Sequence, residues 1–395
     1  MGSRVSFRSI GLLVATAGSL AFVPSGSSPP PDFGAPLPGL TAAQLERFNN
    51  GQEEFSGVET VEEGLGPVFN DVSCGTCHSV PVVGGGSAVL ETRFGTLSPN
   101  GTFDPLSQFG GSLIQLQGIG PNGECDYVSE IVPPEATIVA GRRTTPLFGL
   151  GLVDATPDST FRQIARDESF DRDGIAGLVS MVTNISTGKL AVGKFGWKGQ
   201  NPTLHQFGGD AYLNEMGITN PEFPDENCPQ GDCGALSCNP ASGLNDDGTG
   251  VQEFTDFMTF LAPPPRGRIT PDAASGERIF QNLGCASCHR ADMRTGSNSV
   301  EALNQVTYHP YSDFLLHDMG SLGDGITQNK ATGRLMRTAP LWGLRKLTTY
   351  LHDGRATTFE QAIAAHGGQG RKARDRFQRL QFWEKARLFA FLNSL

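Results

Sequence analysis

Charged residues are scarce in this chain of 395 residues, and long apolar runs are nearly absent. Asp, Glu, Lys and Arg together make up only 18% of the sequence, and the formal net charge is −11. An acidic protein is repelled by nucleic acids and by anionic membrane surfaces. Beyond the N-terminus, no apolar stretch is long enough to span a bilayer. We therefore expect no nucleic-acid partner and no membrane-spanning segment in the body of the chain.

Glycine and proline are abundant, so long regular elements are not expected. The chain has 51 glycines and 26 prolines, and 38% of its residues are apolar. This composition indicates short elements joined by long irregular segments. The length exceeds that of one ordinary core, which makes two domains the default. Short elements leave interior space that a buried prosthetic group would fill.

The N-terminus resembles an export signal. Arg4 and Arg8 precede an apolar run from Ile10 to Val23, which predicts a signal peptide over residues 1–23. The alternative is a retained anchor. Residues 24–40 are rich in Pro, Ser and Gly and are predicted to be a linker. We therefore expect a periplasmic protein that is not stably inserted in the membrane after cleavage.

Histidine and cysteine are also scarce, yet two copies of the motif Cys-x-x-Cys-His occur among 8 cysteines and 7 histidines. The copies are Cys74, Cys77 and His78, and Cys285, Cys288 and His289. In this spacing two thiols reach the two vinyl groups of one porphyrin, and the histidine lies beneath the iron. A thioredoxin-like pair or half of a zinc site would leave the histidine unexplained. The sequence predicts two covalently bound haem c groups, which agrees with export.

Four cysteines remain after the two motifs: Cys125, Cys228, Cys233 and Cys238. An even number of remaining cysteines in an oxidising compartment predicts two disulfides, and the sequence leaves their pairing open. The alternative is a redox-active dithiol that feeds the haems. Nothing nearby suggests a lowered thiol pKa, so structural disulfides are favoured.

The chain repeats its own plan. The paired segments are 41–55 with 270–280, each leading to a haem motif, 143–150 with 337–344, and 197–206 with 352–361. Self-similarity predicts two homologous units. We expect a mainly α, loop-rich fold of two cytochrome c-like haem domains in tandem, at 41–262 and 268–395. The first carries an insertion over about 158–194, whose Asp171–Gly174 could bind calcium but is more typical of a turn.

The ligand opposite each proximal histidine decides the function. For the second haem we favour His366, which precedes Gly-Gly at the end of a predicted helix. His317 and Met319 are rivals, although for His317, as for His352, contact with the haem is the favoured role.

The first haem differs, because no histidine lies between His78 and His205. Either Met216 binds the iron, or the iron is open and Glu215 stands over it. A carboxylate there can move a proton between the two oxygens of a bound peroxide.

These segments together resemble a known family. Gly66–Asn70, the first haem motif, Phe195–Lys198, Asn214–Thr219, Tyr311–Gly320 and His352–Arg355 resemble the bacterial di-haem oxidoreductases, often labelled thiol oxidoreductases. The resemblance runs from about residue 40 to the C-terminus. More distantly, the chain is similar to the di-haem cytochrome c peroxidases and to the enzymes that mature the methylamine dehydrogenase cofactor.

The resemblance implies roles for several residues. Trp197 matches a tryptophan held between the two haems, and Glu215 falls near a distal glutamate, although its spacing from Trp197 is shorter here. His366 falls where the peroxidases carry a methionine ligand, and a histidine there would lower the potential of that haem. Thr338 and Pro340 match backbone carbonyls that hold a calcium ion between the domains.

Three functions follow as hypotheses. The first is a periplasmic di-haem, peroxidase-like oxidoreductase. Its C-terminal haem takes electrons from a small redox protein such as a cytochrome, and they pass by Trp197 to hydrogen peroxide at the N-terminal haem. The second is a non-catalytic electron-transfer protein with both irons capped, by Met216 and His366. The third is an oxidase of thiols or protein side chains.

Overall fold

The computed structural model describes residues 32–169 and 171–395. Its α-helices are α1 (Ala42–Ser56), α2 (Cys74–Cys77), α3 (Leu150–Asp154), α4 (Asp158–Glu168), α5 (Leu204–Met216), α6 (Thr249–Phe260), α7 (Pro271–Leu283), α8 (Phe359–Ala364), α9 (Arg371–Gln378) and α10 (Phe382–Leu392). Short 3-10 turns lie between them. The predicted signal peptide, and the linker as far as residue 31, lie outside the described residues. Within the described part, no helix is both long and apolar enough to span a membrane.

Two helices begin where the sequence predicts. Thr41 caps α1: its hydroxyl accepts a hydrogen bond from the N–H of Gln44, whose side chain accepts one from the N–H of Thr41. This reciprocal pair satisfies backbone donors that would otherwise be unpaired at the helix start. The hydroxyl of Thr270 caps α7 by accepting a hydrogen bond from the N–H of Ala273, and Pro271 stands at the first helical position. Both predicted starts are confirmed.

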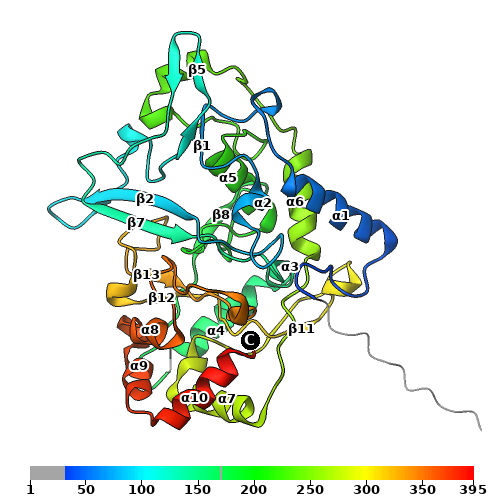
Figure 1. Ribbon diagram of the computed structural model, residues 1–395, viewed down its shortest axis with the longest axis vertical. Helices are drawn as coiled ribbons and strands as arrows, with labels where there is room; N and C mark the ends of the chain where they lie inside the picture. Colours follow the sequence, from blue (N-terminus) through cyan, green and yellow to red (C-terminus); the bar gives the residue numbers. More distant parts are fainter. Residues whose placement is uncertain (1–31, 170) are drawn as a thin grey trace, which may run out of the picture. The chain divides into compact units, whose positions relative to one another are not determined.

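The same helix pair occurs before and after residue 265. Helix α1 packs against α6, and α7 packs against α10 (Figure 1). In the first pair Phe55 meets Phe257 with ring centres 5.1 Å apart. In the second pair Phe280 meets Phe391 at 5.2 Å. Each pair lies directly beside a haem motif, because α2 follows α1 and the second motif follows α7.

The strands are short and all pair antiparallel. One sheet has three strands, in the order β3 (Phe103–Asp104), β2 (Leu90–Leu97) and β7 (Ile138–Arg143). The other strands form pairs: β1 (Val68–Phe69) with β4 (Gln117–Gly118), β5 (Gly120–Asn122) with β6 (Cys125–Tyr127), β8 (Met181–Asn184) with β9 (Lys189–Val192), β10 (Met293–Arg294) with β11 (Thr307–Tyr308), and β12 (Leu316–Asp318) with β13 (Leu335–Arg337). Helical residues make up 35% of the structure and strand residues 16%.

The predicted mainly α fold class is therefore wrong. The chain is mixed α and β, with several small sheets. The glycine-rich connections must still pair their buried backbone groups, and they do so with one another in short ladders. Most of these strands have two to four residues, which is too short for an alternating pattern to appear in the sequence.

The internal repeat extends to local backbone contacts. We call residues 32–262 the first half and residues 268–395 the second half. An isolated bridge joins Phe195 to Asn201 in the first half, and an equivalent bridge joins Tyr350 to Ala356 in the second. Trp197 lies inside the first loop and His352 inside the second. A threonine caps the helix that follows each loop, α5 and α8 respectively.

Two main hydrophobic cores differ in size, and the larger one is not confined to one half; a third, small cluster consists of Phe94, Leu106 and Ile114. The larger core surrounds α1, α5 and α6 but also takes in Phe314 and Trp342 of the second half. Phe161 of α4 meets Phe314 edge-on, with ring centres 6.5 Å apart. The smaller core surrounds α7 and α10. Residues 32–395 form one compact unit, and the domain limits 41–262 and 268–395 stay predictions.

Candidate haem sites

The second motif holds its histidine in a defined tautomer. It forms a 3-10 turn directly after α7, and His289 donates from Nδ1 to the carbonyl of Tyr311 at 3.0 Å. With the proton fixed on Nδ1, the lone pair of Nε2 is free for a metal. Burial lowers the pKa of His289 to about 4, which keeps the ring neutral. A neutral imidazole is the form that binds iron.

His366 lies opposite His289. It follows α8, and its Nδ1 donates to the carbonyl of Ala362 at 2.8 Å, so its Nε2 is also free for a ligand. The two ring centres are 6.5 Å apart. Two imidazoles bound to one metal at about 2.0–2.1 Å would have ring centres about 6 Å apart. This spacing would let both imidazoles bind one iron.

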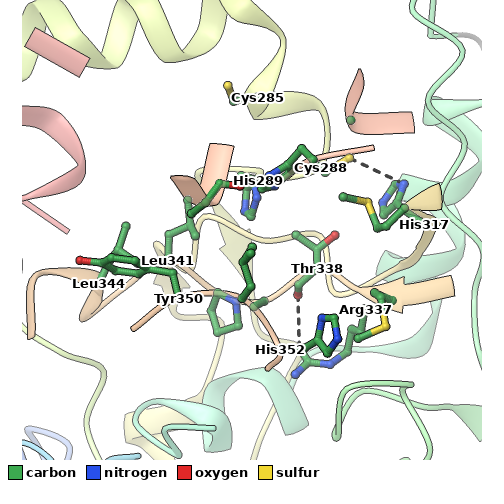
Figure 2. Close-up of a pocket in the computed structure, with 18 of the residues that line it drawn as sticks. Cys285, Cys288, His289, His317, Arg337, Thr338, Leu341, Leu344, Tyr350 and His352 are labelled. Carbon is green, nitrogen blue, oxygen red and sulfur yellow. Dashed lines mark hydrogen bonds between the residues drawn. The ribbon is translucent and has the colours of Figure 1, made fainter. Parts of the chain in front are cut away.

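A cavity of about 260 Å³ surrounds this pair. Cys285, Cys288, His289 and His366 all line it, together with apolar side chains such as Leu344. Figure 2 shows Cys285, Cys288, His289 and Leu344 among the lining side chains. An apolar enclosure with two cysteines at one edge and two facing imidazoles is the environment that a covalently bound haem requires. The residues of the second site therefore fit the group.

The thiols of both motifs are held protonated. Burial raises the pKa of Cys74 to about 12, that of Cys77 to about 11 and that of Cys285 to about 12. Reactive dithiols and zinc-binding thiolates require the opposite shift. These pKa values favour thioether attachment over the alternative thioredoxin-like and zinc sites.

His317 contacts the attachment cysteine and lines the cavity. Its Nδ1 lies 3.7 Å from Sγ of Cys288 (Figure 2) and 2.8 Å from Oε1 of Gln369, and its Nε2 lies 2.9 Å from Oδ2 of Asp313. Burial alone would lower the pKa of His317, but the charge and hydrogen bond of Asp313 raise it to about 12. A protonated imidazole cannot bind a metal, so neither the iron nor an ion between Cys288, Asp313 and His317 is an expected partner.

The first motif repeats the backbone hydrogen bond that the histidine of the second motif makes. Helix α2 carries Cys74 and Cys77, and the Ser73 hydroxyl caps it by accepting from the N–H of Gly75 at 3.2 Å. His78 donates from Nδ1 to the carbonyl of Gly85 at 3.0 Å. Burial lowers its pKa to about 4. His78, like His289, therefore has a neutral ring whose Nε2 is free to bind a metal.

The last turn of α5 brings both predicted distal residues to the first site. Sδ of Met216 lies 3.9 Å from Sγ of Cys74. Because Cys74 would bond the edge of the porphyrin, this contact favours the edge for Met216 rather than the iron.

Glu215 is held by the segment before the motif. Its carboxylate accepts a hydrogen bond from Asn70 Nδ2 at 2.8 Å, and its carbonyl accepts the Asn70 N–H at 2.7 Å. Burial raises the pKa of Glu215, while Arg93 opposes that shift. No role for Asn70 was predicted from the sequence, although Asn70 ends the segment Gly66–Asn70 that carries part of the family resemblance.

Trp197 and His352 meet where the two halves touch. Their rings are 6.1 Å apart in a T-shaped contact, and both line the cavity of the second site. The indole Nε1 of Trp197 donates to the carbonyl of Arg143 at 3.0 Å. Trp197 therefore belongs to the first half by sequence and to the second site by position.

One of the two predicted calcium ligands, the carbonyl of Thr338, does not fit a cation. The Thr338 carbonyl accepts hydrogen bonds from the Ser312 hydroxyl at 2.8 Å and from the Arg337 guanidinium at 3.3 Å (Figure 2). A calcium ion there would face a buried positive charge.

Asp171–Gly174 forms a turn, as the sequence favoured. Oδ1 of Asp171 accepts the N–H of Asp173 at 2.6 Å, and Asp173 pairs with Arg376 of the second half at 2.8 Å. The insertion thus docks on the second half through this turn.

The remaining cysteines form two disulfides, Cys125–Cys238 and Cys228–Cys233. The first joins β6 to the turn at residues 233–238 and closes a long stretch of the first half. None of the four cysteines lines the cavity of the second site. The pairing that the sequence left open is thereby assigned.

Residues 128–395 match the family described as "Di-haem oxidoreductase, putative peroxidase". The match covers the second motif, Trp197, Glu215 and His366 but begins after the first motif. No curated protein matches the chain.

Solved structures show distant similarity. A hydrazine synthase from Kuenenia stuttgartiensis is 13% identical, over 98% of this chain and 100% of that chain, with a TM-score of 0.38. A MauG-like protein associated with microbial copper homeostasis is 14% identical, over 93% and 92%, with a TM-score of 0.40. The diheme peroxidase BthA from Burkholderia thailandensis E264 is 14% identical, over 89% and 86%, with a TM-score of 0.41. Likenesses this distant carry no argument.

Proposed function

Because the chain belongs to the di-haem oxidoreductase family, we propose that it is a c-type di-haem enzyme that reduces a peroxide. In this proposal both haems are covalently attached, at Cys74 and Cys77 and at Cys285 and Cys288. Electrons enter at the second haem, and the peroxide is reduced at the first. The oxidoreductase character rests on the family, and the assignment of the two roles rests on the geometry of the sites.

One observation carries the assignment: the second site has two facing imidazoles and the first has one. His289 and His366 have ring centres 6.5 Å apart, and each binds a backbone carbonyl through Nδ1. An iron with two protein ligands has no position for a substrate, which suits electron transfer. At the first site, Met216 contacts the attachment cysteine instead, which supports an iron with an open position.

Bound haem supplies the redox chemistry at both sites, and the chain supplies the proton transfer. Glu215 is buried, and burial raises the pKa of its carboxyl group. Its carboxylate would accept a proton from one oxygen of the peroxide and return it to the other, which the cleavage of the O–O bond requires. Asn70 holds the carboxyl group in place through its hydrogen bond of 2.8 Å.

Trp197 supports transfer between the halves. It lines the second cavity, yet its loop directly precedes α5, the helix that ends in Glu215 and Met216. Its indole is fixed at Nε1 by the carbonyl of Arg143 and in contact with the ring of His352. A rigid aromatic ring between two redox centres is a suitable relay for electrons.

The cellular setting is part of the proposal. The N-terminal sequence supports export to the periplasm, where covalent haem attachment occurs in bacteria. The net charge of −11 would suit a basic redox protein, such as a small cytochrome, as the electron donor.

Anaerobic stopped-flow mixing of the fully reduced holoprotein with hydrogen peroxide tests the proposal. We expect rapid reoxidation of both haems by one equivalent of peroxide, at a rate that depends on peroxide concentration and is followed in the Soret band. Slow bleaching without stoichiometric reoxidation would mean that both irons are capped. The chain would then be a non-catalytic electron-transfer protein.

A further inference from the structure

Two buried arginines line the cavity of the second site, and they are equivalent by the internal repeat. Arg143 begins the segment 143–150, and Arg337 begins its echo 337–344. Each side chain is 7% exposed, and both residues line the cavity. Figure 2 shows Arg337 beside His352 and Thr338. One arginine comes from each half of the chain.

Neither guanidinium has a carboxylate partner within the part of the chain that the structure describes. Arg143 donates from Nη1 to the carbonyl of Thr349, while its buried Nε has no hydrogen-bond partner among the described residues. Arg337 donates from Nε to the carbonyl of Gly196 at 2.6 Å. Their neighbour Arg142 differs, since it forms an ion pair with Asp324 at 2.7 Å.

Burying two positive charges without a directly bonded carboxylate is costly. The charge of Asp313 acts on Arg337, but the oxygens of Asp313 bind His317 and the N–H of Leu315. A guanidinium cannot lose its proton in a protein, so burial must be offset by an anion rather than by neutralisation. Backbone carbonyls satisfy individual N–H groups but carry no net negative charge. The fork of N–H donors on arginine matches a carboxylate, which it binds through two parallel hydrogen bonds. The cavity is therefore built to receive a ligand with carboxylate groups.

We propose that Arg143 and Arg337 bind the two carboxylate side chains of the haem at the second site. This places the carboxylate edge of that haem at the contact between the halves, beside Trp197 and His352. Cys285 and Cys288 hold the porphyrin elsewhere on its periphery. The inference rests on the proposed function only in requiring a haem in this cavity.

The arginines would also tune the potential of this haem. A guanidinium close to the porphyrin stabilises the ferrous state relative to the ferric state, because reduction removes one positive charge from the iron. The effect is strong in an apolar cavity, where charges are poorly screened. Replacing either arginine by a neutral residue should therefore make the second haem harder to reduce.

The test compares Arg143→Gln and Arg337→Gln with the unmodified holoprotein. Potentials are measured for each haem by spectroelectrochemistry, and the bending modes of the haem carboxylates by resonance Raman spectroscopy. We expect the ferric–ferrous equilibrium of the second haem to shift at least tenfold toward ferric, which is about 59 mV for one electron. The carboxylate modes should shift in both variants, and Arg143→Lys should restore the potential but not the modes.

Arg345→Gln is the matched control. Arg345 also has a buried nitrogen without a hydrogen-bond partner among the described residues, but it does not line the cavity. It should leave the potential and the carboxylate modes unchanged. If the potential of the second haem and the carboxylate modes were the same in all variants, with the haem present, the inference would be overturned while the proposed function stayed intact. Displacement of the signals by added succinate would also overturn it, because the arginines would then bind an exchangeable anion. Absence of a haem spectrum from the unmodified protein would instead refute the proposed function.

Discussion

The backbone N–H of Arg143 donates to the carbonyl of His352 at 2.7 Å. The repeat reproduces this bond with the roles of the halves exchanged, since the N–H of Arg337 donates to the carbonyl of Trp197 at 2.9 Å. Each half thus holds the backbone of the aromatic residue of the other half by an equivalent hydrogen bond. The contact between the halves has approximate two-fold symmetry, although the residues at the equivalent positions, Trp197 and His352, differ.

Because Trp197 and His352 differ chemically, the two equivalent positions of this contact suit different roles. The indole of Trp197 is large and donates one hydrogen bond, which suits a fixed ring on an electron path. His352 is buried, and burial lowers the pKa of its imidazole, so it is neutral where it meets Trp197. Under the proposed function, one half of the duplicated unit serves electron entry and the other serves the substrate.

Glu215→Gln separates catalysis from electron transfer. The amide keeps the shape and can still bind Asn70, but it cannot carry a proton between two oxygens. We expect the rate of peroxide reduction to fall about 10²–10⁴-fold, with the potentials of both haems nearly unchanged. Steady-state peroxide assays and spectroelectrochemistry measure the two quantities. The control is Glu226→Gln, a buried carboxyl of the first half with a pKa raised to about 7 by burial, which should keep full activity. Full activity of Glu215→Gln would remove Glu215 from the proposed mechanism.

His366→Met should raise the potential of the second haem. Methionine is a weaker donor to ferric iron than imidazole, so it favours the reduced state. His366→Ala should instead leave the iron five-coordinate, which gives a high-spin signal in electron paramagnetic resonance. His309→Ala serves as the control, because His309 is exposed and pairs with Asp292 at the surface. If the spectra of His366→Ala match those of the unmodified protein, another residue binds the second iron.

Features that depend on neighbouring residues could be predicted from the sequence, whereas contacts between distant segments could not. The starts of α1 and α7 follow from residues within one helical turn, Thr41 with Gln44 and Thr270 with Pro271. The two haem motifs are equally local. The unpaired guanidinium of Arg143 could not be predicted, because it depends on a lack of carboxylates in segments far away in the chain.

Tertiary contacts likewise decide the roles of the distal candidates. Met216 is adjacent to Glu215 in sequence, and only its distance to Cys74 favours the porphyrin edge. His317 was a rival iron ligand until its contact with Asp313, which makes the imidazole a cation. The mixed fold was missed for the same reason, since short strands are specified by their partners rather than by their own pattern.

Glu168→Gln should flatten the pH dependence of stability. Glu168 ends α4 of the first half yet lies 3.8 Å from Nε2 of His317 in the second half. Burial and the charge of Asp313 raise its pKa to about 8. A raised pKa in the folded state adds stability that is complete below about pH 4.5 and is lost as the pH rises to about 8.

The measurement is the free energy of unfolding of the holoprotein, from urea titrations at pH 5 and pH 8. Relative to Glu168→Gln, the unmodified protein should lose about 1–3 kcal/mol between these values. Glu360→Gln is the control, as Glu360 is exposed and pairs with Lys385 at the surface. If the free energy of unfolding changed equally with pH in Glu168→Gln and in the unmodified protein, Glu168 would ionise as easily in the folded chain as in the unfolded one.

The two disulfides should differ in what they contribute. Cys125 and Cys238 are 113 residues apart, whereas Cys228 and Cys233 are separated by 5. A cross-link stabilises mainly by restricting the unfolded chain, and the effect grows with the loop that it closes. Replacing Cys125 and Cys238 together by alanine should therefore cost about 2–5 kcal/mol of the free energy of unfolding. The double alanine variant of Cys228 and Cys233 should cost clearly less. Under the proposed function, which assigns this disulfide no part, the variant should retain peroxide reduction. Loss of turnover in that second variant, with stability and haem content unchanged, would favour the thiol-oxidase hypothesis over peroxide reduction.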